Sequence, residues 1–293
     1  PVNTLISFLL GLLARLPRGV LQSVGIVVGL VNHFLNTRAA RVTSVNLALC
    51  GMDPGLRKKS LIETGKTLLE TPATWLAPTD RIDDWICHVH GVDLLEQAIE
   101  SERGLLILLP HLGNWELINV FYRRYGLMTA LYHPPKRKVM RSLMAEVRGQ
   151  HGNEMVPTTR QGLARLYRAL NEGRTVVVLP DQIPTSGRYI PFIGPLALTD
   201  ELSVRLLKKT SARVLGLSII RRNDGRFDIH ILEPADEIFS DDMDVALTAM
   251  NELVEEAVRL APAQYQWEYK RFRERPAGET KIYRFNKPPE VHS

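Results

Sequence analysis

The chain has 293 residues, of which 45% are hydrophobic and 24% charged, and its formal net charge is +5. The apolar content excludes wholesale disorder, and the lack of a Gly/Ser-rich linker or an internal repeat favours one compact domain over two. A basic chain is expected to meet an anionic partner, which can be nucleic acid, an anionic membrane surface or an acidic protein. Nucleic acid ranks last, because the sequence contains no helix-turn-helix, zinc-finger or RNP-like motif.

Two apolar segments open the chain. Residues 5–14 are almost wholly apolar, residues 20–35 are rich in Leu, Val and Gly, and Arg15-Leu16-Pro17-Arg18 separates them. Each segment is shorter than the roughly 20 residues that span a bilayer, and the basic n-region and cleavage site of a signal peptide are missing. We therefore expect membrane-associated, interfacial helices in residues 1–40, ahead of a catalytic domain in residues 41–293. The alternative is an ordinary amphipathic pair of helices that covers this domain.

Helical and strand patterns then alternate along the chain. The periodicity predicts helices at residues 57–77, 94–100, 115–122, 138–150, 160–171, 200–210 and 242–260, and strands at 86–92, 104–109, 127–132, 175–179, 214–220 and 227–232. The runs at 104–109 and 175–179 are continuously apolar, which is typical of buried parallel strands. Asn223-Asp224-Gly225 predicts a hairpin between the last two strands. Together these elements predict a single-domain α/β sandwich, with a mixed, largely parallel sheet flanked by helices.

His111 follows the first apolar strand, at the end where open α/β sheets bind their ligands. Glu116 comes five residues later, in the first turn of the next helix, for which Asn114 is the expected N-cap. With a turn between them, Glu116 can fold back and hold one imidazole nitrogen, which leaves the other free to take a proton from a hydroxyl. The pair is therefore a candidate catalytic dyad. The simpler interpretation is a turn histidine and a glutamate that interacts with the helix dipole.

The second apolar strand also ends in polar residues, Asp181 and Gln182, so we expect the two strand ends to converge on one crevice. The sequence has no GxSxG elbow, Walker loop or GxGxxG motif, and a His/Glu site without a nucleophile favours direct transfer to an acceptor hydroxyl. His88-Val89-His90 could place two imidazoles on one face of a strand. No third ligand has a convincing spacing, so neither a metal nor a cofactor is expected.

Several separated blocks resemble the bacterial lipid A late acyltransferases, the lauroyl/myristoyl transferase family within the lysophospholipid/glycerolipid acyltransferase superfamily. The blocks are His111-Leu112-Gly113-Asn114-Trp115-Glu116, Tyr132-His133-Pro134 with Arg148, Asp181-Gln182 with Pro191-Phe192-Ile193-Gly194, and Gln264-Tyr265-Gln266-Trp267 with Lys270-Arg271-Phe272.

The chain departs from the family pattern at three positions. His133 replaces the arginine of the usual Tyr-Arg-Pro, Tyr269 replaces the histidine that commonly follows the tryptophan block, and Leu112 stands where phenylalanine is common. These changes do not affect His111, Glu116 or Arg148, but they leave the acceptor open.

The resemblance implies transfer of a fatty acyl chain from an acyl thioester to a hydroxyl of a phosphate-bearing lipid A precursor, at the cytoplasmic face of the bacterial inner membrane. The donor is usually acyl carrier protein, and CoA is the alternative. In this interpretation His111 is the general base, Glu116 orients it, and Arg148 offsets negative charge on the thioester oxyanion or on an acceptor phosphate. The remaining expectations are that Asn114, Asp181 and Gln182 bind substrate and that an acidic carrier docks on Lys136-Arg137-Lys138 and Arg141.

Three alternatives use the same residues. An acyltransferase for another membrane lipid would differ only in its acceptor. A thioesterase or lipid hydrolase would use water instead of a lipid hydroxyl, and only the exclusion of water from the acyl site separates it from a transferase. A non-catalytic lipid-binding protein would keep the fold without the chemistry, and the intact His111, Glu116 and Arg148 argue against it.

Overall fold

The computed structural model describes residues 2–132, 152–283 and 285. Its main sheet has seven strands in the order β1-β9-β8-β2-β5-β3-β4. All neighbouring pairs are parallel except the β8/β9 hairpin, so the predicted mixed, largely parallel sheet is confirmed. The strands are β1 (Ile86–His90), β2 (Leu105–Leu108), β3 (Met128–Tyr132), β4 (Glu154–Pro157), β5 (Thr175–Val178), β8 (Arg213–Arg221) and β9 (Phe227–Leu232).

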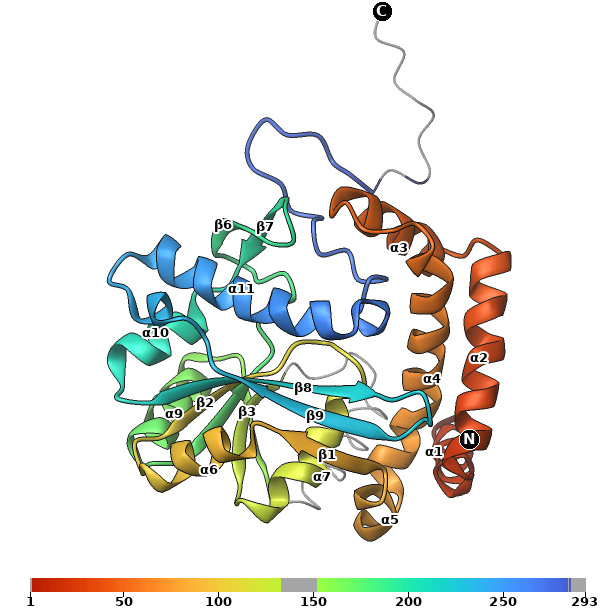
Figure 1. Ribbon diagram of the computed structural model, residues 1–293, viewed down its shortest axis with the longest axis horizontal. Helices are drawn as coiled ribbons and strands as arrows, with labels where there is room; N and C mark the ends of the chain where they lie inside the picture. The colour runs from red at the N-terminus through yellow and green to blue at the C-terminus, as the bar shows by residue number, and fades with distance from the viewer. Residues whose placement is uncertain (1, 133–151, 284, 286–293) are drawn as a thin grey trace, which may run out of the picture.

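The two continuously apolar strands lie in the interior of this sheet. β2 and β5 are buried along their whole length, as the sequence predicts for strands covered on both faces. Successive side chains of β2 point to opposite faces, so Leu105 and Ile107 join one core cluster while Leu106 and Leu108 join the other. The first cluster includes α6 (Val92–Glu100) and α7 (Ile118–Phe121), and the second includes α9 (Arg160–Asn171), α10 (Leu202–Lys209) and α11 (Met243–Leu260). Figure 1 shows the resulting α/β/α sandwich, with α11 on one face and α6 and α7 on the other.

The N-terminal helices form one edge of the molecule. α2 (Arg18–Phe34) lies along α4 (Leu56–Leu76), with α1 (Val2–Arg15) beside them (Figure 1). Glycines allow the backbones of α2 and α4 to touch, because a Cβ on Gly25 would lie 2.5 Å from the Cα of Lys66 and one on Gly65 would lie 2.2 Å from the carbonyl oxygen of Gly25. Helix α2 is therefore closely packed against the rest of the domain.

Among the described residues, no helix is by itself both long enough and apolar enough to cross a bilayer. The part of α1 from Phe8 onward and α2 satisfy these criteria only as a pair, and the pair is bent by 117°.

Several elements differ from the sequence-based expectation. α3 (Arg38–Leu49), the edge strand β4 and the small antiparallel sheet of β6 (Arg188–Pro191) and β7 (Leu196–Thr199) were not predicted, because none of these segments has a long periodic apolar pattern. The helix expected at 115–122 is divided into η1 (Trp115–Leu117), α7 and η2 (Tyr122–Arg124). The helix expected at 138–150 lies outside the described residues. The remaining elements are α5 (Thr79–Asp83), η3 (Asp236–Phe239) and η4 (Pro262–Gln264).

Candidate active site

The carboxyl ends of β2 and β5 bring His111 and Asp181 together. The two strands pair in parallel from Leu105↔Thr175 to Leu108↔Val178, and the peptide N–H of Leu109 donates to the carbonyl of Val178 at 2.9 Å. The segments that follow therefore leave the sheet side by side. The expected convergence of the two strand ends is confirmed.

Asp181 holds His111 through two hydrogen bonds. The Nδ1 of His111 lies 2.8 Å from Oδ1 of Asp181, and the peptide N–H of His111 donates to Oδ2 at 2.8 Å. A buried carboxylate at Nδ1 requires an N–H there, so the neutral ring carries its lone pair on Nε2. Ring orientation and tautomer are both fixed by a residue 70 positions away in the chain.

This contact changes the role expected for Asp181. The sequence predicted that Glu116 would hold an imidazole nitrogen and that Asp181 would bind substrate. Asp181 instead occupies the Nδ1 side of the ring, and only 3% of its surface is exposed. Glu116 is also buried, and it lines a cavity next to His111. An orienting role for Glu116 stays a prediction.

The surroundings of Asp181 keep its carboxyl ionised. Burial by itself raises the pKa of Asp181, but the neighbouring His111 and its two hydrogen bonds, together with the charge of Arg271, lower the pKa so that the net shift is downward. Arg271 is buried and donates to the carbonyl of Leu198 at 2.5 Å. A fixed negative charge behind the imidazole stabilises the positive charge that a general base acquires when it takes a proton.

Gln182 contacts the other side of the ring. Its Nε2 donates to Nε2 of His111 at 3.1 Å and lies 3.3 Å from Oε1 of Gln266. Gln266 belongs to a segment that pairs with the His111 loop, since its own peptide N–H donates to the carbonyl of His111 at 3.1 Å. The prediction that Gln182 lies in the crevice is confirmed, and an incoming hydroxyl would replace its amide at the Nε2 lone pair.

Asn114 does not have the role expected for it. It stands at the N-cap position of η1, but its side chain makes no capping hydrogen bond, is completely buried, and donates to Oε2 of Glu70 at 3.0 Å. A residue without exposed surface in this arrangement has no access to substrate. Gly113 beside it has a φ of +61°, and a Cβ there would lie 1.9 Å from the carbonyl oxygen of Ile219. The loop therefore requires glycine at position 113.

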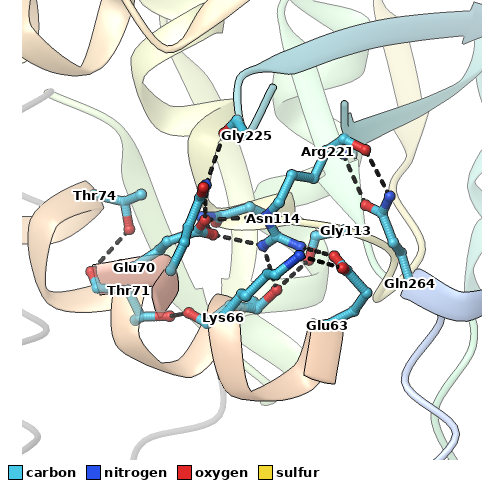
Figure 2. A network of polar contacts seen from close by, with 12 residues as sticks. Glu63, Lys66, Glu70, Thr71, Thr74, Gly113, Asn114, Arg221, Gly225 and Gln264 are labelled. Atoms are coloured by element: carbon cyan, nitrogen blue, oxygen red, sulfur yellow. Dashed lines mark hydrogen bonds and ion pairs between the residues drawn. The ribbon is translucent and has the colours of Figure 1, made fainter. Parts of the chain in front are cut away.

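A buried ion-pair network, which was not predicted from the sequence, supports this loop. Arg221 donates from Nε to Oε1 of Glu70 at 3.0 Å and from Nη2 to Oε2 at 2.6 Å, and it also pairs with Glu63. Figure 2 shows that Asn114 meets the same carboxylate of Glu70 from the loop side. Gln264 brackets the backbone of Arg221 through two hydrogen bonds of 2.7 Å. The ion pairs and hydrogen bonds of Glu70 and Arg221 thus connect helix α4, strand β8 and the loop after β2.

Two cavities with different lining residues meet at His111 and Trp115, whose rings lie 5.0 Å apart at their centroids. The apolar cavity, of about 350 Å³, runs over the sheet surface between Leu109, Ile118, Met128, Ala130 and Val177, with Glu116 in its wall. It shares Gln182, Asp200 and Leu202 with a larger groove of about 900 Å³. The polar cavity, of about 200 Å³, lies on the α4 side and is lined by Thr64, Thr67, Leu68, Thr71, Gly113, Gln264, Gln266 and Glu268.

Some predicted residues lie elsewhere. Arg148 and the cluster at 136–141 are outside the described residues. His88 and His90 are on the edge strand β1, and β9 brings Asp228 and His230 beside them. The third ligand that the sequence argument lacked is therefore supplied by another strand, although the guanidinium of Arg222 already contacts Asp228 and His88.

Comparison with known proteins identifies the family. The family model described as bacterial lipid A biosynthesis acyltransferase matches residues 2–274. The chain is 28% identical over 286 residues to the lipid A biosynthesis palmitoleoyltransferase of Escherichia coli (strain K12), covering 94% of this chain and 92% of that protein. It is 27% identical over 282 residues to the lipid A biosynthesis lauroyltransferase of the same organism, covering 92% and 90%.

A relative with a different name matches a smaller part of the chain. The phosphatidylinositol mannoside acyltransferase of Mycolicibacterium smegmatis (strain ATCC 700084 / mc(2)155) is 25% identical over 142 residues, 47% of each chain. The family model, by contrast, covers nearly the whole sequence, including both strand ends that form the site. The chain therefore belongs to the bacterial lipid A biosynthesis acyltransferase family and is an acyltransferase.

Proposed function

We propose that the protein transfers a fatty acyl chain from an acyl thioester to a hydroxyl of a lipid A precursor, with His111 as the general base. The observation that carries this proposal is the geometry of the ring, with Nδ1 bound to ionised Asp181 and the Nε2 lone pair at the meeting point of two cavities. Nε2 takes the proton of the acceptor hydroxyl while its oxygen attacks the thioester carbonyl. The C–S bond then breaks, and the imidazolium returns the proton to the leaving thiolate.

The apolar cavity suits the acyl chain of the donor. Its walls come from Leu109, Ile118, Met128, Ala130 and Val177, and it begins at His111, where the thioester carbonyl must lie for transfer. Burial of an acyl chain in such a site contributes about 0.8 kcal/mol per methylene. The groove beyond Gln182 and Asp200 is the approach for the arm that carries the thioester.

The proposal also covers the identity of the acyl donor and the roles of Glu116 and Arg148. Acyl carrier protein is the proposed donor, with CoA as the alternative, because a basic chain suits an acidic carrier. Glu116 is proposed to act with Asp181 on the electrostatics of His111, since its buried carboxyl shares the apolar cavity with the ring. Arg148 keeps its proposed role of offsetting negative charge on the thioester oxyanion or an acceptor phosphate.

We also propose that the protein rests on the cytoplasmic face of the inner membrane through α1 and α2. Val20, Val24, Val27, Val31 and Phe34 are exposed and recur every three or four residues along α2, which places them on one face. Phe8, Leu9 and Leu12 are exposed on α1. An exposed apolar stripe of this length is typical of helices that lie in a membrane interface.

A second acceptor class is favoured by one observation. The partial similarity to a phosphatidylinositol mannoside acyltransferase supports a different membrane glycolipid as the acceptor for the same chemistry. Mass spectrometry of total lipids from cells that lack the protein distinguishes the two. Lipid A that lacks one acyl chain supports the proposal, and unchanged lipid A together with another under-acylated lipid supports the second class.

Restoration with variants tests the role of His111. The wild-type chain should restore the missing acyl chain, and His111→Ala should not, with an in vitro loss of about two to four orders of magnitude in turnover. An active His111→Ala enzyme would overturn the assignment of the general base. Release of free fatty acid instead of an acylated lipid would show a hydrolase.

A further inference from the structure

The acyl donor proposed above occupies the apolar cavity and the adjoining groove, and the polar cavity has no part in binding it. The apolar cavity and the adjoining groove share Gln182, Asp200 and Leu202, so together they give a continuous path for an acyl chain and its thioester arm. The polar cavity shares none of its described lining with that groove, and it meets the apolar cavity only at His111 and Trp115. It therefore gives a separate route to the base.

The walls of the polar cavity are rich in neutral hydrogen-bonding groups. Hydroxyls come from Thr64 and Thr71 of α4, and an amide comes from Gln266. The side chains of Thr67 and Gln264 also line the cavity but are already bonded to Arg221. Trp115 adds an indole face next to the imidazole. Hydroxyls, amides and one aromatic surface are the groups that bind a hydroxyl-bearing, uncharged ligand.

Glu268 is the one acid among the described residues that line this cavity. Its Oε2 accepts a hydrogen bond from the hydroxyl of Thr64 at 3.1 Å. Burial raises the pKa of Glu268, and this effect outweighs the hydrogen bonds and the nearby His111, which lower it. The protonated form of a carboxyl can donate a hydrogen bond as well as accept one, and burial favours that form at Glu268.

The described lining contains no lysine or arginine that could bind a phosphate. Arg221 lies behind the cavity but is buried and committed to Glu70 and Glu63. An anion beside Glu268 would meet a carboxyl group and no free cation from these walls. The charge pattern therefore favours a neutral ligand.

We propose that the polar cavity binds the neutral, hydroxyl-bearing group of the acyl acceptor, and that Glu268 with Thr64 determines which hydroxyl reaches Nε2 of His111. The proposal rests on the acyl transfer proposed above and adds the subsite and the ligand chemistry. A volume of about 200 Å³ is below the usual size of sites for whole drug-sized ligands, so it fits one part of a lipid.

Initial rates with the purified full-length protein test this subsite. The acceptor is a lipid A precursor in mixed micelles, and the donor is dodecanoyl acyl carrier protein. Glu268→Leu should raise the apparent KM for the acceptor about tenfold or more, and Thr64→Val about two- to tenfold, as expected for lost hydrogen bonds. Glu268→Gln keeps hydrogen bonding without charge and should stay within about threefold of the wild type.

The donor and a matched surface variant provide the controls. The KM for the donor should change by less than about twofold in all three variants, which a general loss of structure would not give. Glu256→Leu makes the same substitution at an exposed position of α11 and should leave both constants unchanged. An unchanged acceptor KM in both Glu268→Leu and Thr64→Val, or a rise in the donor KM alone, would overturn the proposal. A wild-type enzyme that acylates no lipid would instead overturn the proposed function.

Two small probes distinguish the source of the hydroxyl. Octyl β-glucoside carries sugar hydroxyls without a hydroxyacyl chain, and methyl 3-hydroxydodecanoate carries a chain hydroxyl without a sugar. The probe whose hydroxyl resembles that of the acceptor should compete with the acceptor. This competition should be weaker in Glu268→Leu than in the wild type. Methyl dodecanoate is the control without a hydroxyl. If neither probe competes better than methyl dodecanoate, the cavity does not recognise a neutral hydroxyl.

Discussion

At the residue scale, the site depends on the carboxylate that contacts the imidazole. Asp181→Asn keeps the size of the side chain but removes the charge that favours the imidazolium and presents an amide to Nδ1. We expect turnover to fall by about two to four orders of magnitude with little change in thermal stability. Steady-state kinetics with saturating donor and acceptor measure the effect.

A comparison with Glu116→Gln makes this test specific. Both substitutions replace a buried carboxyl by an amide beside the same ring. Asp236→Asn, on the exposed surface, is the neutral control. Near-normal turnover in Asp181→Asn, combined with a large loss in Glu116→Gln, would show that Glu116 and not Asp181 supports the base.

The raised pKa of Glu268 has a consequence for stability. A carboxyl with a higher pKa in the folded state binds its proton more tightly when folded, so its contribution to stability is complete below the unfolded-state pKa and is lost as the pH rises through the folded pKa. The wild type should therefore lose stability relative to Glu268→Gln as the pH rises above about 4.5. Thermal unfolding of both proteins between pH 4 and 8 measures the difference, and parallel curves would contradict the assignment.

The sequence predicts which strand ends meet, but not that Asp181 contacts the ring. The pattern of apolar runs followed by His111 and by Asp181 is local, so it is visible in the chain. The contact between Asp181 and Nδ1 of His111 depends on the register between β2 and β5, which the sequence alone does not determine. Asn114 was misassigned for a related reason, since its partner Glu70 is 44 positions away.

At the element scale, the Arg221 network joins α4 to β8 and to the loop that carries His111. Arg221→Met would leave Glu70 buried without its cation, and we expect a loss of about 3–5 kcal/mol in the free energy of unfolding. Arg226→Met removes an exposed pair with Asp224 and should cost less than about 1 kcal/mol. Urea denaturation followed by tryptophan fluorescence compares the two variants.

The double variant Glu70→Leu/Arg221→Met provides the further check. Because it removes the unpaired charge as well, it should be more stable than Arg221→Met alone. A single variant with wild-type stability would show that the network contributes nothing. A charge pair of this kind could not be predicted, because Arg221-Arg222 and Lys270-Arg271 look like solvated basic clusters in the sequence, yet Arg221 and Arg271 are buried.

At the scale of the whole molecule, the exposed stripe on α2 predicts membrane binding. Replacing Val24 and Val31 by glutamate should weaken binding to anionic vesicles by about tenfold or more, because two apolar side chains lose their burial and gain charge. Phe239→Glu places a charge at an exposed apolar residue outside the stripe and serves as the control. Vesicle co-sedimentation measures both.

Substitution is a better test here than truncation. Leu21 of α2 is completely buried in the core, and Gln22 donates to Glu70 at 2.7 Å. Deleting the N-terminal helices would therefore damage the core and the network as well as any membrane contact. Equal binding of the double variant and the wild type would locate the membrane contact elsewhere.

The packing of helix α4 has a consequence for which acceptor lipids the enzyme could use. One side of it meets α2 backbone to backbone at Gly25 and Gly65, and its threonines line the polar cavity. The distance between His111 and the exposed apolar stripe on α2 is therefore set by rigid packing. For an enzyme seated on a bilayer by that stripe, the base would act at one fixed depth along the membrane normal. A lipid whose hydroxyl lies at another depth in the bilayer would not place that hydroxyl at Nε2 of His111. Such a lipid would be excluded by the position of its hydroxyl, whatever groups surround it.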